Sequence, residues 1–154
     1  MSWQVRLAGT GDMPGVYALR YDVFVLGQDV PEELERDELD AFADHVVAVD
    51  GSRVVGTGRL VDGRIDEEGN LEPGTVGTVG TIGRMAVSAD LRGTGVGRAL
   101  LDALVTRAEE RGLPGVELHA QVHARAFYER AGFVPFGAVY LEAGIEHLGM
   151  RRDL

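Results

Sequence analysis

The chain has 154 residues, of which 45% are hydrophobic and 26% charged, values that are usual for one compact domain in water. Its formal net charge of -10 comes from 25 acidic and 15 basic residues, so its surface repels the phosphates of nucleic acids and favours cationic partners. There is no cysteine, which excludes disulfides, thiolate metal sites and a cysteine nucleophile.

The N-terminal segment gives no sign of targeting. No run approaches the roughly 18 uninterrupted apolar residues that a membrane helix needs. The first residues, MSWQVRLAGTGDM, have no apolar block behind a basic end. We therefore expect a cytoplasmic protein with neither a membrane nor a nucleic acid as its partner.

The first third of the chain predicts a strand, a helix and a hairpin. Residues 3–8, WQVRLA, alternate as a strand does, and Asp12 and Pro14 then mark a helix start. Apolar residues at helical spacing through MPGVYALRYDVFVL predict one amphipathic helix over residues 13–26. After an acidic segment at residues 28–44, HVVAVDGSRVVGTGRLV predicts a hairpin that turns at Asp50 and Gly51.

The rest of the chain alternates strands and helices. A glycine-rich loop leads into the strand TIGRMAV. The segment SADLRGTGVGRALLDALVTRAEERG predicts a loop and then a helix, with Val96, Leu100, Ala103 and Leu104 on one apolar face and Gly112 as its stop. PGVELHAQ is a predicted strand, HARAFYERAGF a short helix ended by Gly132, and AVYLEAGIEHLGMRRDL two short strands around Ala143 and Gly144. No linker interrupts this order, so residues 1–154 are expected to form a single mixed α/β domain.

Three kinds of phosphate site compete for the glycine-rich segment RGTGVGR, residues 92–98. A P-loop needs a lysine after its last glycine, and this chain has no lysine. A dinucleotide fingerprint needs the spacing Gly-x-Gly-x-x-Gly directly after the first strand of a βαβ unit, whereas this segment lies in mid-chain with the spacing Gly93-x-Gly95-x-Gly97.

The third interpretation fits both position and spacing. RMAVSADLRGTGVGRALL resembles the acetyl-CoA-binding core of the GCN5-related N-acetyltransferases (GNAT), in which Arg92, Gly95 and Gly97 match the pattern Arg/Gln-x-x-Gly-x-Gly/Ala. In that family the backbone N–H groups of this turn hold the CoA pyrophosphate. Free amides and the positive end of the helix dipole favour an anion at such a place.

A second motif supports the resemblance. AFYERAGF, residues 126–133, resembles the later GNAT motif in which a tyrosine lies near the cofactor sulfur. VFVLGQDVPEELERDELDAFADH and the ending GIEHLGM resemble the ElaA-like branch of the superfamily, although Gly27 stands before Gln28 where a glutamate is expected. If that acid is catalytic in relatives, its role is missing here.

The resemblance implies a GNAT fold, an α/β (α+β) structure with a mixed central sheet of about six to seven strands, helices on both faces, and a splay between the fourth and fifth strands. It implies transfer of an acetyl group from acetyl-CoA, as co-substrate, to a primary amine of a small molecule or peptide in a ternary complex. The acceptor is expected to be cationic, and a homodimer is a candidate state because many members are dimers. A non-catalytic acyl-CoA-binding or sensing module is the alternative.

The resemblance also assigns candidate site residues. The backbone of the fourth strand would hold the pantetheine, the Val87 amide would donate to the oxyanion, and the Tyr128 phenol would protonate the CoA thiolate. The implied cofactor-binding residues are Met85, Ala86, Val87, Arg92, Gly93, Thr94, Gly95, Val96, Gly97, Arg98, Phe127 and Tyr128.

The general base stays open at the level of sequence. His119, Glu142 and His147 are candidates, and a route through water is equally open. His119 and His123 have a four-residue spacing but belong to a strand end and a helix start, so no metal site is expected. The acidic segment is either a lip that attracts a cationic amine or a solvated helix face.

Overall fold

The computed structural model describes residues 2–154. Its strands and α-helices are β1 (Trp3–Leu7), α1 (Met13–Arg20), α2 (Glu32–Glu35), β2 (Asp44–Asp50), β3 (Arg53–Asp62), β4 (Gly80–Val87), α3 (Val96–Glu110), β5 (Gly115–Gln121), α4 (Arg125–Arg130), β6 (Val134–Glu142) and β7 (Ile145–Asp153). They follow the predicted order except for the short α2, which the sequence analysis did not predict. The chain groups into two compact units. The first holds the residues up to Leu60 and Arg84–Thr106, and the second holds Val61–Gly83 and Arg107–Leu154.

The strands form a seven-stranded mixed sheet in the order β1-β2-β3-β4-β5-β7-β6. β4 and β5 are parallel and pair from Gly80 with Val116 to Ile82 with Leu118. The pairs β1 with β2, β2 with β3, β5 with β7 and β6 with β7 are antiparallel. The predicted mixed sheet of six to seven strands is therefore confirmed.

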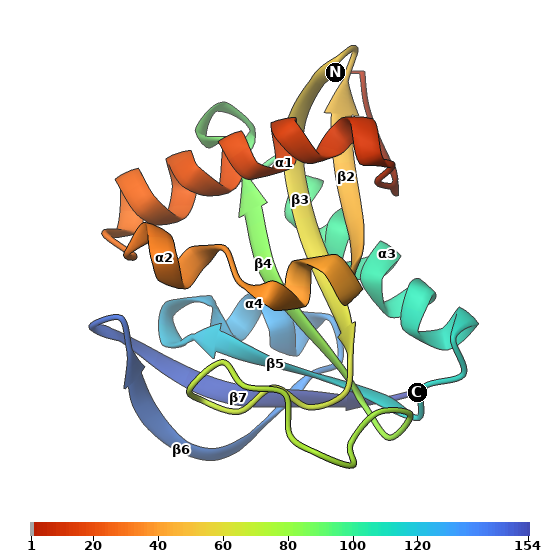
Figure 1. The fold of residues 1–154 in the computed structure, drawn as a ribbon, viewed down its shortest axis with the longest axis vertical. Helices are drawn as coiled ribbons and strands as arrows, with labels where there is room; N and C mark the ends of the chain where they lie inside the picture. Colours follow the sequence, from red (N-terminus) through yellow and green to blue (C-terminus); the bar gives the residue numbers. More distant parts are fainter. Residues whose placement is uncertain (1) are drawn as a thin grey trace. The chain divides into compact units, whose positions relative to one another are not determined.

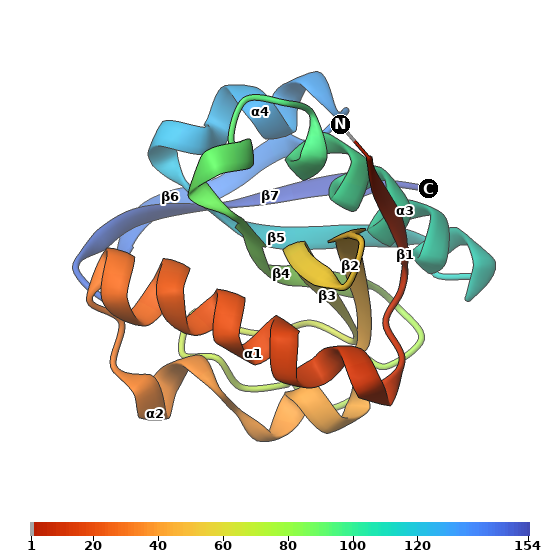
Figure 2. The same cartoon turned by 90° about the horizontal axis from the view of Figure 1, so that it is seen from above.

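In the first unit, helices cover both faces of β2 and β3, with α1 on one face and α3 on the other (Figures 1 and 2). Glycines allow both helices to come close. A Cβ atom on Gly15 of α1 would lie 2.7 Å from Val54 of β3, and one on Gly56 would lie 2.8 Å from Leu100 of α3. Val96, Leu100 and Leu104 of the predicted apolar face are fully buried.

The hairpin of β2 and β3 turns where the sequence predicts it. Gly51 has a φ of 63°, a left-handed conformation that glycine adopts without the strain that other residues incur. A register shift between Ala48 and Val49 then changes the face to which the side chains of β3 point. Val54 consequently faces α1, whereas Gly56 faces α3.

In the second unit, α4 lies on one face of β5 and β7, and the loop at residues 63–79 lies on the other (Figures 1 and 2). The Arg64 guanidinium of this loop donates to the Glu117 carboxylate of β5 at 2.8 Å. Ala143 and Gly144, with φ values of 52° and 76°, form the tight turn between β6 and β7. Each of these strands is nine residues long, so the prediction of two short strands was wrong in length.

The predicted helix over residues 13–26 also differs in part. α1 ends at Arg20, and Tyr21–Leu26 continue it as a π-helix, a distinction that apolar spacing alone does not reveal. Asp12 is the N-cap residue but makes no capping bond with its side chain, because its carboxylate accepts from Gly9 N and from Arg6. Among residues 2–154, no helix combines the length and apolar character needed to cross a membrane.

Candidate functional site

The segment after β4 turns through two left-handed glycines before α3 begins. Gly93 has a φ of 78° and Gly95 a φ of 96°, and a Cβ atom on either would meet nothing within 4 Å. The glycines are therefore needed for backbone conformation and not for packing against the protein. They also leave the space beside this backbone open to a ligand.

The start of α3 offers consecutive backbone donors. Its first helical hydrogen bond runs from Ala99 N to Gly95 O at 3.1 Å, so the N–H groups of Val96, Gly97 and Arg98 precede the helical ladder. The side chain of Val96 is fully buried, so its part in a site is limited to its backbone. The Arg98 side chain pairs with Asp102 at 3.0 Å. An anion at this helix start would meet amides and the positive end of the dipole.

The strand before this turn carries an unusual backbone residue. Arg84 of β4 has a φ of 52°, a left-handed conformation that costs an arginine free energy and needs support from its surroundings. Its Nε donates to Glu35 O at 3.0 Å, and its Nη2 donates to Asp37 Oδ2 at 3.1 Å. These bonds hold the backbone immediately before Met85, the first of the three predicted pantetheine-binding residues.

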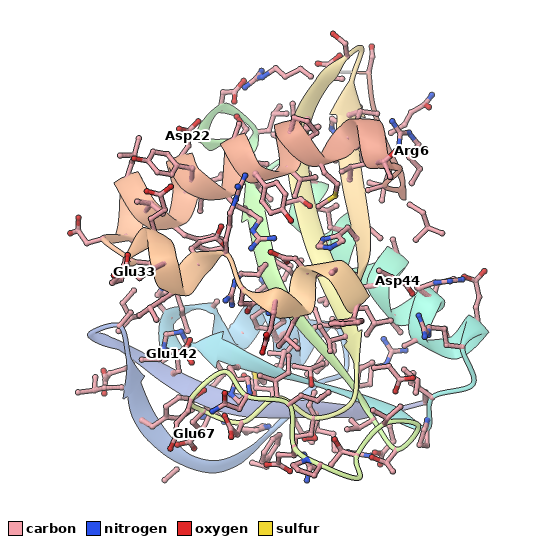
Figure 3. The ribbon with its side chains drawn as sticks, in the orientation of Figure 1. Arg6, Asp22, Glu33, Asp44, Glu67 and Glu142 are labelled. Carbon is pink, nitrogen blue, oxygen red and sulfur yellow. The ribbon has the colours of Figure 1, made fainter. Side chains whose placement is uncertain are left out.

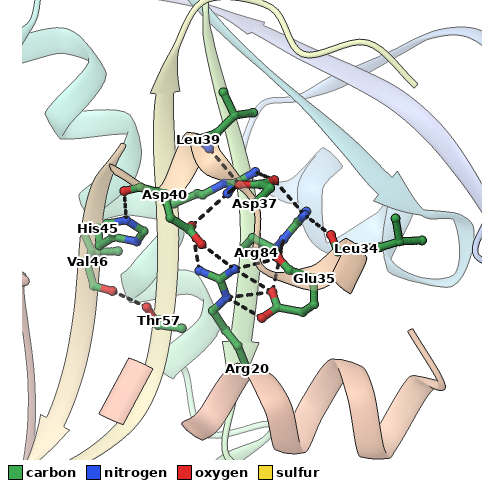
Figure 4. A network of polar contacts seen from close by, with 11 residues as sticks. Arg20, Leu34, Glu35, Asp37, Leu39, Asp40, His45, Val46, Thr57 and Arg84 are labelled. Carbon is green, nitrogen blue, oxygen red and sulfur yellow. Dashed lines mark hydrogen bonds and ion pairs between the residues drawn. The ribbon is translucent and has the colours of Figure 1, made fainter. Parts of the chain in front are cut away.

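Arg84 belongs to a buried ion network, shown in Figure 4. Arg20, which is fully buried, donates to Glu35 at 2.8 Å and to Asp40 at 2.9 Å. Arg59 bridges Asp37 at 2.7 Å and Asp40 at 2.9 Å. The network of Arg20, Arg59 and Arg84 with Glu35, Asp37 and Asp40 balances three positive charges with three negative ones, as buried charges require.

This network removes part of the acidic segment from both of its interpretations. Glu35 and Asp40 are buried and bound to arginines, so they serve neither as a lip nor as a solvated face. Glu33 is exposed and projects outward from α2 (Figure 3). The sequence did contain a signal for the buried part, because Arg20 lies four residues after Val16 on the apolar stripe of α1 and would need acidic partners there.

The second unit holds the tyrosine of the later motif. Tyr128 lies on α4 with its ring edge-on to Phe127 at 5.1 Å and to Phe133 at 6.1 Å between centroids. Burial raises the pKa of Tyr128 to about 12, so the phenol keeps its proton at neutral pH. A proton donor is the role that the resemblance gives to this residue.

The candidate bases His119, Glu142 and His147 lie together in the second unit. His119 Nδ1 is 2.5 Å from the Tyr140 hydroxyl, and the Tyr140 ring lies 5.9 Å from that of His147. His147 Nε2 is 3.5 Å from the Glu142 carboxylate, an ion pair only when the histidine is protonated. Tyr140, which joins these groups, was missed by the sequence reasoning because its position in a predicted strand carries no motif.

The other two histidines have different hydrogen-bond partners. His123 is exposed and its Nε2 is 2.6 Å from Gln121 Oε1. His45, which opens β2 in the first unit, contacts Asp40 O through Nε2 at 3.0 Å and is buried, so it serves the structure of the ion network. Within residues 2–154 no group of three or more histidine, aspartate or glutamate side chains is arranged to hold a metal ion.

Comparisons with known proteins agree on one family. The model of the family described as "Acetyltransferase (GNAT) domain" matches residues 15–154. The uncharacterized N-acetyltransferase YjcF of Bacillus subtilis is 37% identical over 140 residues, which cover 89% of each chain. Protein ElaA of Escherichia coli is 34% identical over 138 residues, which cover 88% of this chain and 84% of ElaA.

Solved structures give the same result. An acyl-CoA N-acyltransferase from Pseudomonas aeruginosa superposes with a TM-score of 0.80 at 33% identity, over 98% of both chains. E. coli ElaA superposes with a TM-score of 0.78 at 29% identity, again over 98% of both chains. The resemblance to the ElaA-like branch and the predicted fold are thereby confirmed.

Proposed function

Because the chain belongs to the GNAT family of acetyltransferases, we propose that it moves an acetyl group from acetyl-CoA to a primary amine in a ternary complex. The observation that carries the proposal is the turn at Arg92–Gly95, where two left-handed glycines precede three consecutive N–H groups at the start of α3. In this proposal those amides hold the CoA pyrophosphate, while Arg92, Thr94 and Arg98 surround it.

The strand before the turn holds the reacting part of the co-substrate. Backbone groups of Met85, Ala86 and Val87 bind the pantetheine as an added strand would, and the Val87 amide donates to the thioester oxygen as it becomes an oxyanion. Arg84 and the ion network behind it fix the course of this strand before any ligand binds.

The chemical step requires one proton to leave the amine and one to reach sulfur. The neutral amine attacks the thioester carbon, and the C–S bond breaks with its electron pair passing to sulfur. The raised pKa keeps the Tyr128 phenol protonated at neutral pH, so it has a proton to donate to this thiolate, and water then returns a proton to the phenol. No metal is needed for any of these events. The net charge of -10 favours an acceptor that arrives as a cation and loses its proton at the site.

The proposal is tested by mixing the protein with acetyl-CoA and a panel of spermidine, tyramine and a lysine-containing peptide, and measuring free CoA thiol. Because the chain has no cysteine, every thiol detected comes from the co-substrate. Tight binding of acetyl-CoA without release of free CoA in the presence of any of these amines would favour the sensing module instead.

Tyr128→Phe tests the proton donor in the same assay. The variant keeps the ring contacts with Phe127 and Phe133, so its fold and its acetyl-CoA affinity should stay the same. We expect turnover at least tenfold lower, since general acid catalysis contributes about 10²–10⁴-fold. Turnover near that of the wild type would remove Tyr128 from the mechanism. Tyr21→Phe, at an exposed tyrosine of the first unit, is the matched control.

A further inference from the structure

A tyrosine and two histidines from three neighbouring strands meet in the second unit. His119 lies on β5, Tyr140 on β6 and His147 on β7, and the strand pairing places Tyr140 opposite His147. The Tyr140 ring is edge-on to His119 at 5.9 Å and tilted by 31° against His147 at the same distance. The two histidines therefore fix the orientation of the tyrosine.

The surroundings of His119 determine which of its nitrogens carries the proton. Its Nε2 lies 2.8 Å from the carbonyl oxygen of Ile65, and a carbonyl can only accept a hydrogen bond. Nε2 is therefore the protonated nitrogen of the neutral ring. Nδ1 has no proton in that form, so it accepts the hydrogen bond from the Tyr140 hydroxyl, 2.5 Å away.

With this assignment, the Tyr140 oxygen can only accept further hydrogen bonds. A phenol has one proton to donate, and that proton is engaged by His119. Further hydrogen bonds to the Tyr140 oxygen must come from an N–H or O–H donor, such as an amine. Burial raises the pKa of Tyr140 above its ordinary value, and the charges of Glu142 and Glu67 raise it further, so the phenol stays protonated over the physiological range.

His147 is not equivalent to His119. Its Nδ1 donates to Ile145 O at 2.7 Å, and its Nε2 faces the Glu142 carboxylate at 3.5 Å. The ring is also buried, with 6% of its surface exposed. The partners of His147 are therefore a carbonyl and a carboxylate, whereas Nδ1 of His119 contacts the hydroxyl of Tyr140, a residue that is itself partly exposed.

The position of the pair in the sheet suits a substrate site. His119 is two residues from the carboxyl end of β5. β5 is parallel to β4 and antiparallel to β7, so the strand direction changes at this place. In open α/β sheets, ligands bind outside the carboxyl ends of parallel strands, and β4 and β5 form a parallel pair in this sheet.

We propose, on the basis of the acetyltransferase function proposed above, that Tyr140 and His119 together accept the proton of the acceptor amine. The nitrogen that has attacked the thioester gives its proton to the Tyr140 oxygen, and the Tyr140 hydroxyl gives its own proton to His119 Nδ1. His119 becomes an imidazolium whose Nε2–H bond to Ile65 O is strengthened by the charge. The ring then returns this proton to water, while the departing sulfur receives a separate proton from Tyr128.

Several charged groups lie near the pair. Glu142 follows Tyr140 in β6, Glu67 lies in the loop that packs against β5, and both are labelled in Figure 3. Glu117 lies two residues before His119 and is neutralised by Arg64 and Arg151. The carboxylates of Glu142 and Glu67 thus act on the Tyr140 hydroxyl, and their negative charges attract a cationic amine to it.

The hydrogen-bond assignment is tested without any turnover by recording histidine side-chain nitrogen shifts of ¹⁵N-labelled protein. We expect neutral His119 to carry its proton on Nε2, and Tyr140→Phe to shift the Nδ1 resonance because its hydrogen bond is lost. A neutral His119 protonated on Nδ1 would overturn the proposal.

The kinetic test uses acetyl-CoA with spermidine, tyramine and the lysine-containing peptide as acceptors. Tyr140→Phe and His119→Gln should each lower kcat/KM for the amine by at least tenfold, leave acetyl-CoA affinity unchanged and remove one inflection from the pH profile of kcat/KM. His123→Gln, an exposed histidine of the same unit, is the control that should keep both rate and profile.

The outcomes separate this proposal from the function on which it rests. If the wild type transfers acetyl and both variants keep their kcat/KM within about threefold with an unchanged pH profile, the pair is structural and the proposal is overturned. If the wild type binds acetyl-CoA but acetylates none of the amines, the proposed function itself fails and this proposal falls with it.

Discussion

Replacing Asp40 by asparagine tests whether the acidic segment belongs to the core of the first unit. The Asp40 side chain is 6% exposed and accepts hydrogen bonds from Arg20 Nη1 at 2.9 Å, from Arg20 Nη2 at 3.1 Å and from Arg59 Nη1 at 2.9 Å. Asparagine has almost the same shape but no charge, and its NH₂ group cannot accept from a guanidinium. The substitution therefore leaves guanidinium protons without acceptors in a buried place.

The size of the effect follows from the remaining partners. Removing one member of a buried ion pair costs about 3–5 kcal/mol, because the other charge stays buried. Here Arg20 keeps Glu35 and Arg59 keeps Asp37, so part of the compensation survives. We expect Asp40→Asn to lower the free energy of unfolding by about 2–4 kcal/mol, a large part of the roughly 5–15 kcal/mol typical of a domain.

Urea unfolding at pH 7, followed by circular dichroism, measures this difference. Asp90→Asn is the matched control, because Asp90 pairs with Arg53 at the surface and both side chains are more than half exposed. The control should unfold at the wild-type urea concentration. A loss below about 1 kcal/mol for Asp40→Asn would refute the view that the network is buried and tightly coupled.

Two further predictions follow from the same unit. Burial opposes the ionisation of Asp40, but hydrogen bonds from Arg20 and the charges of Arg20 and Arg59 outweigh it and hold its pKa below the ordinary value. The resulting stabilisation is complete above the unfolded-state pKa of about 3.9 and is lost as pH falls through the lower folded-state pKa. The melting temperature should therefore fall between pH 7 and pH 2, and this fall should be smaller in Asp40→Asn than in the wild type. Gly95→Ala places a side chain on a residue with a φ of 96° and should weaken acetyl-CoA binding, measured by calorimetry, about tenfold. Gly11→Ala is the control, because its added Cβ atom would meet nothing within 4 Å, and it should keep the wild-type affinity. Equal affinities of the two variants would contradict the assignment of the turn as the CoA pyrophosphate site.

Local sequence signals predicted most of the fold. Two turns and two helix ends require a left-handed backbone, and glycine, which adopts it readily, marks these places in the sequence. The turns lie at Gly51 and Gly144, and the helices end at Gly112 and Gly132. The order of strands and helices follows from these turns and from apolar periodicity. The π-helix after Arg20 did not follow, since its spacing of apolar residues resembles that of an α-helix.

The polar part of the site depended on contacts between distant segments. Tyr140 meets His119 only because β7 pairs with both β5 and β6 in a defined register, and that register is not encoded near either residue. The acidic segment likewise gained its role from Arg59, which is 19 residues from Asp40. The motifs around Gly95 and Tyr128 were visible because they are local, and His119 was among the candidate bases, whereas its partner Tyr140 was not predicted.

The central claim is acetyl transfer to an amine, and the most direct measurement follows the acetyl group itself. Acetyl-CoA labelled with ¹³C in its acetyl group is incubated with the protein and each amine of the panel, and mass spectrometry quantifies both the labelled amide and free CoA. We predict one labelled amide for each CoA released, with at least one amine. Free CoA that accumulates with labelled acetate and without any amide would show thioester hydrolysis and contradict the account.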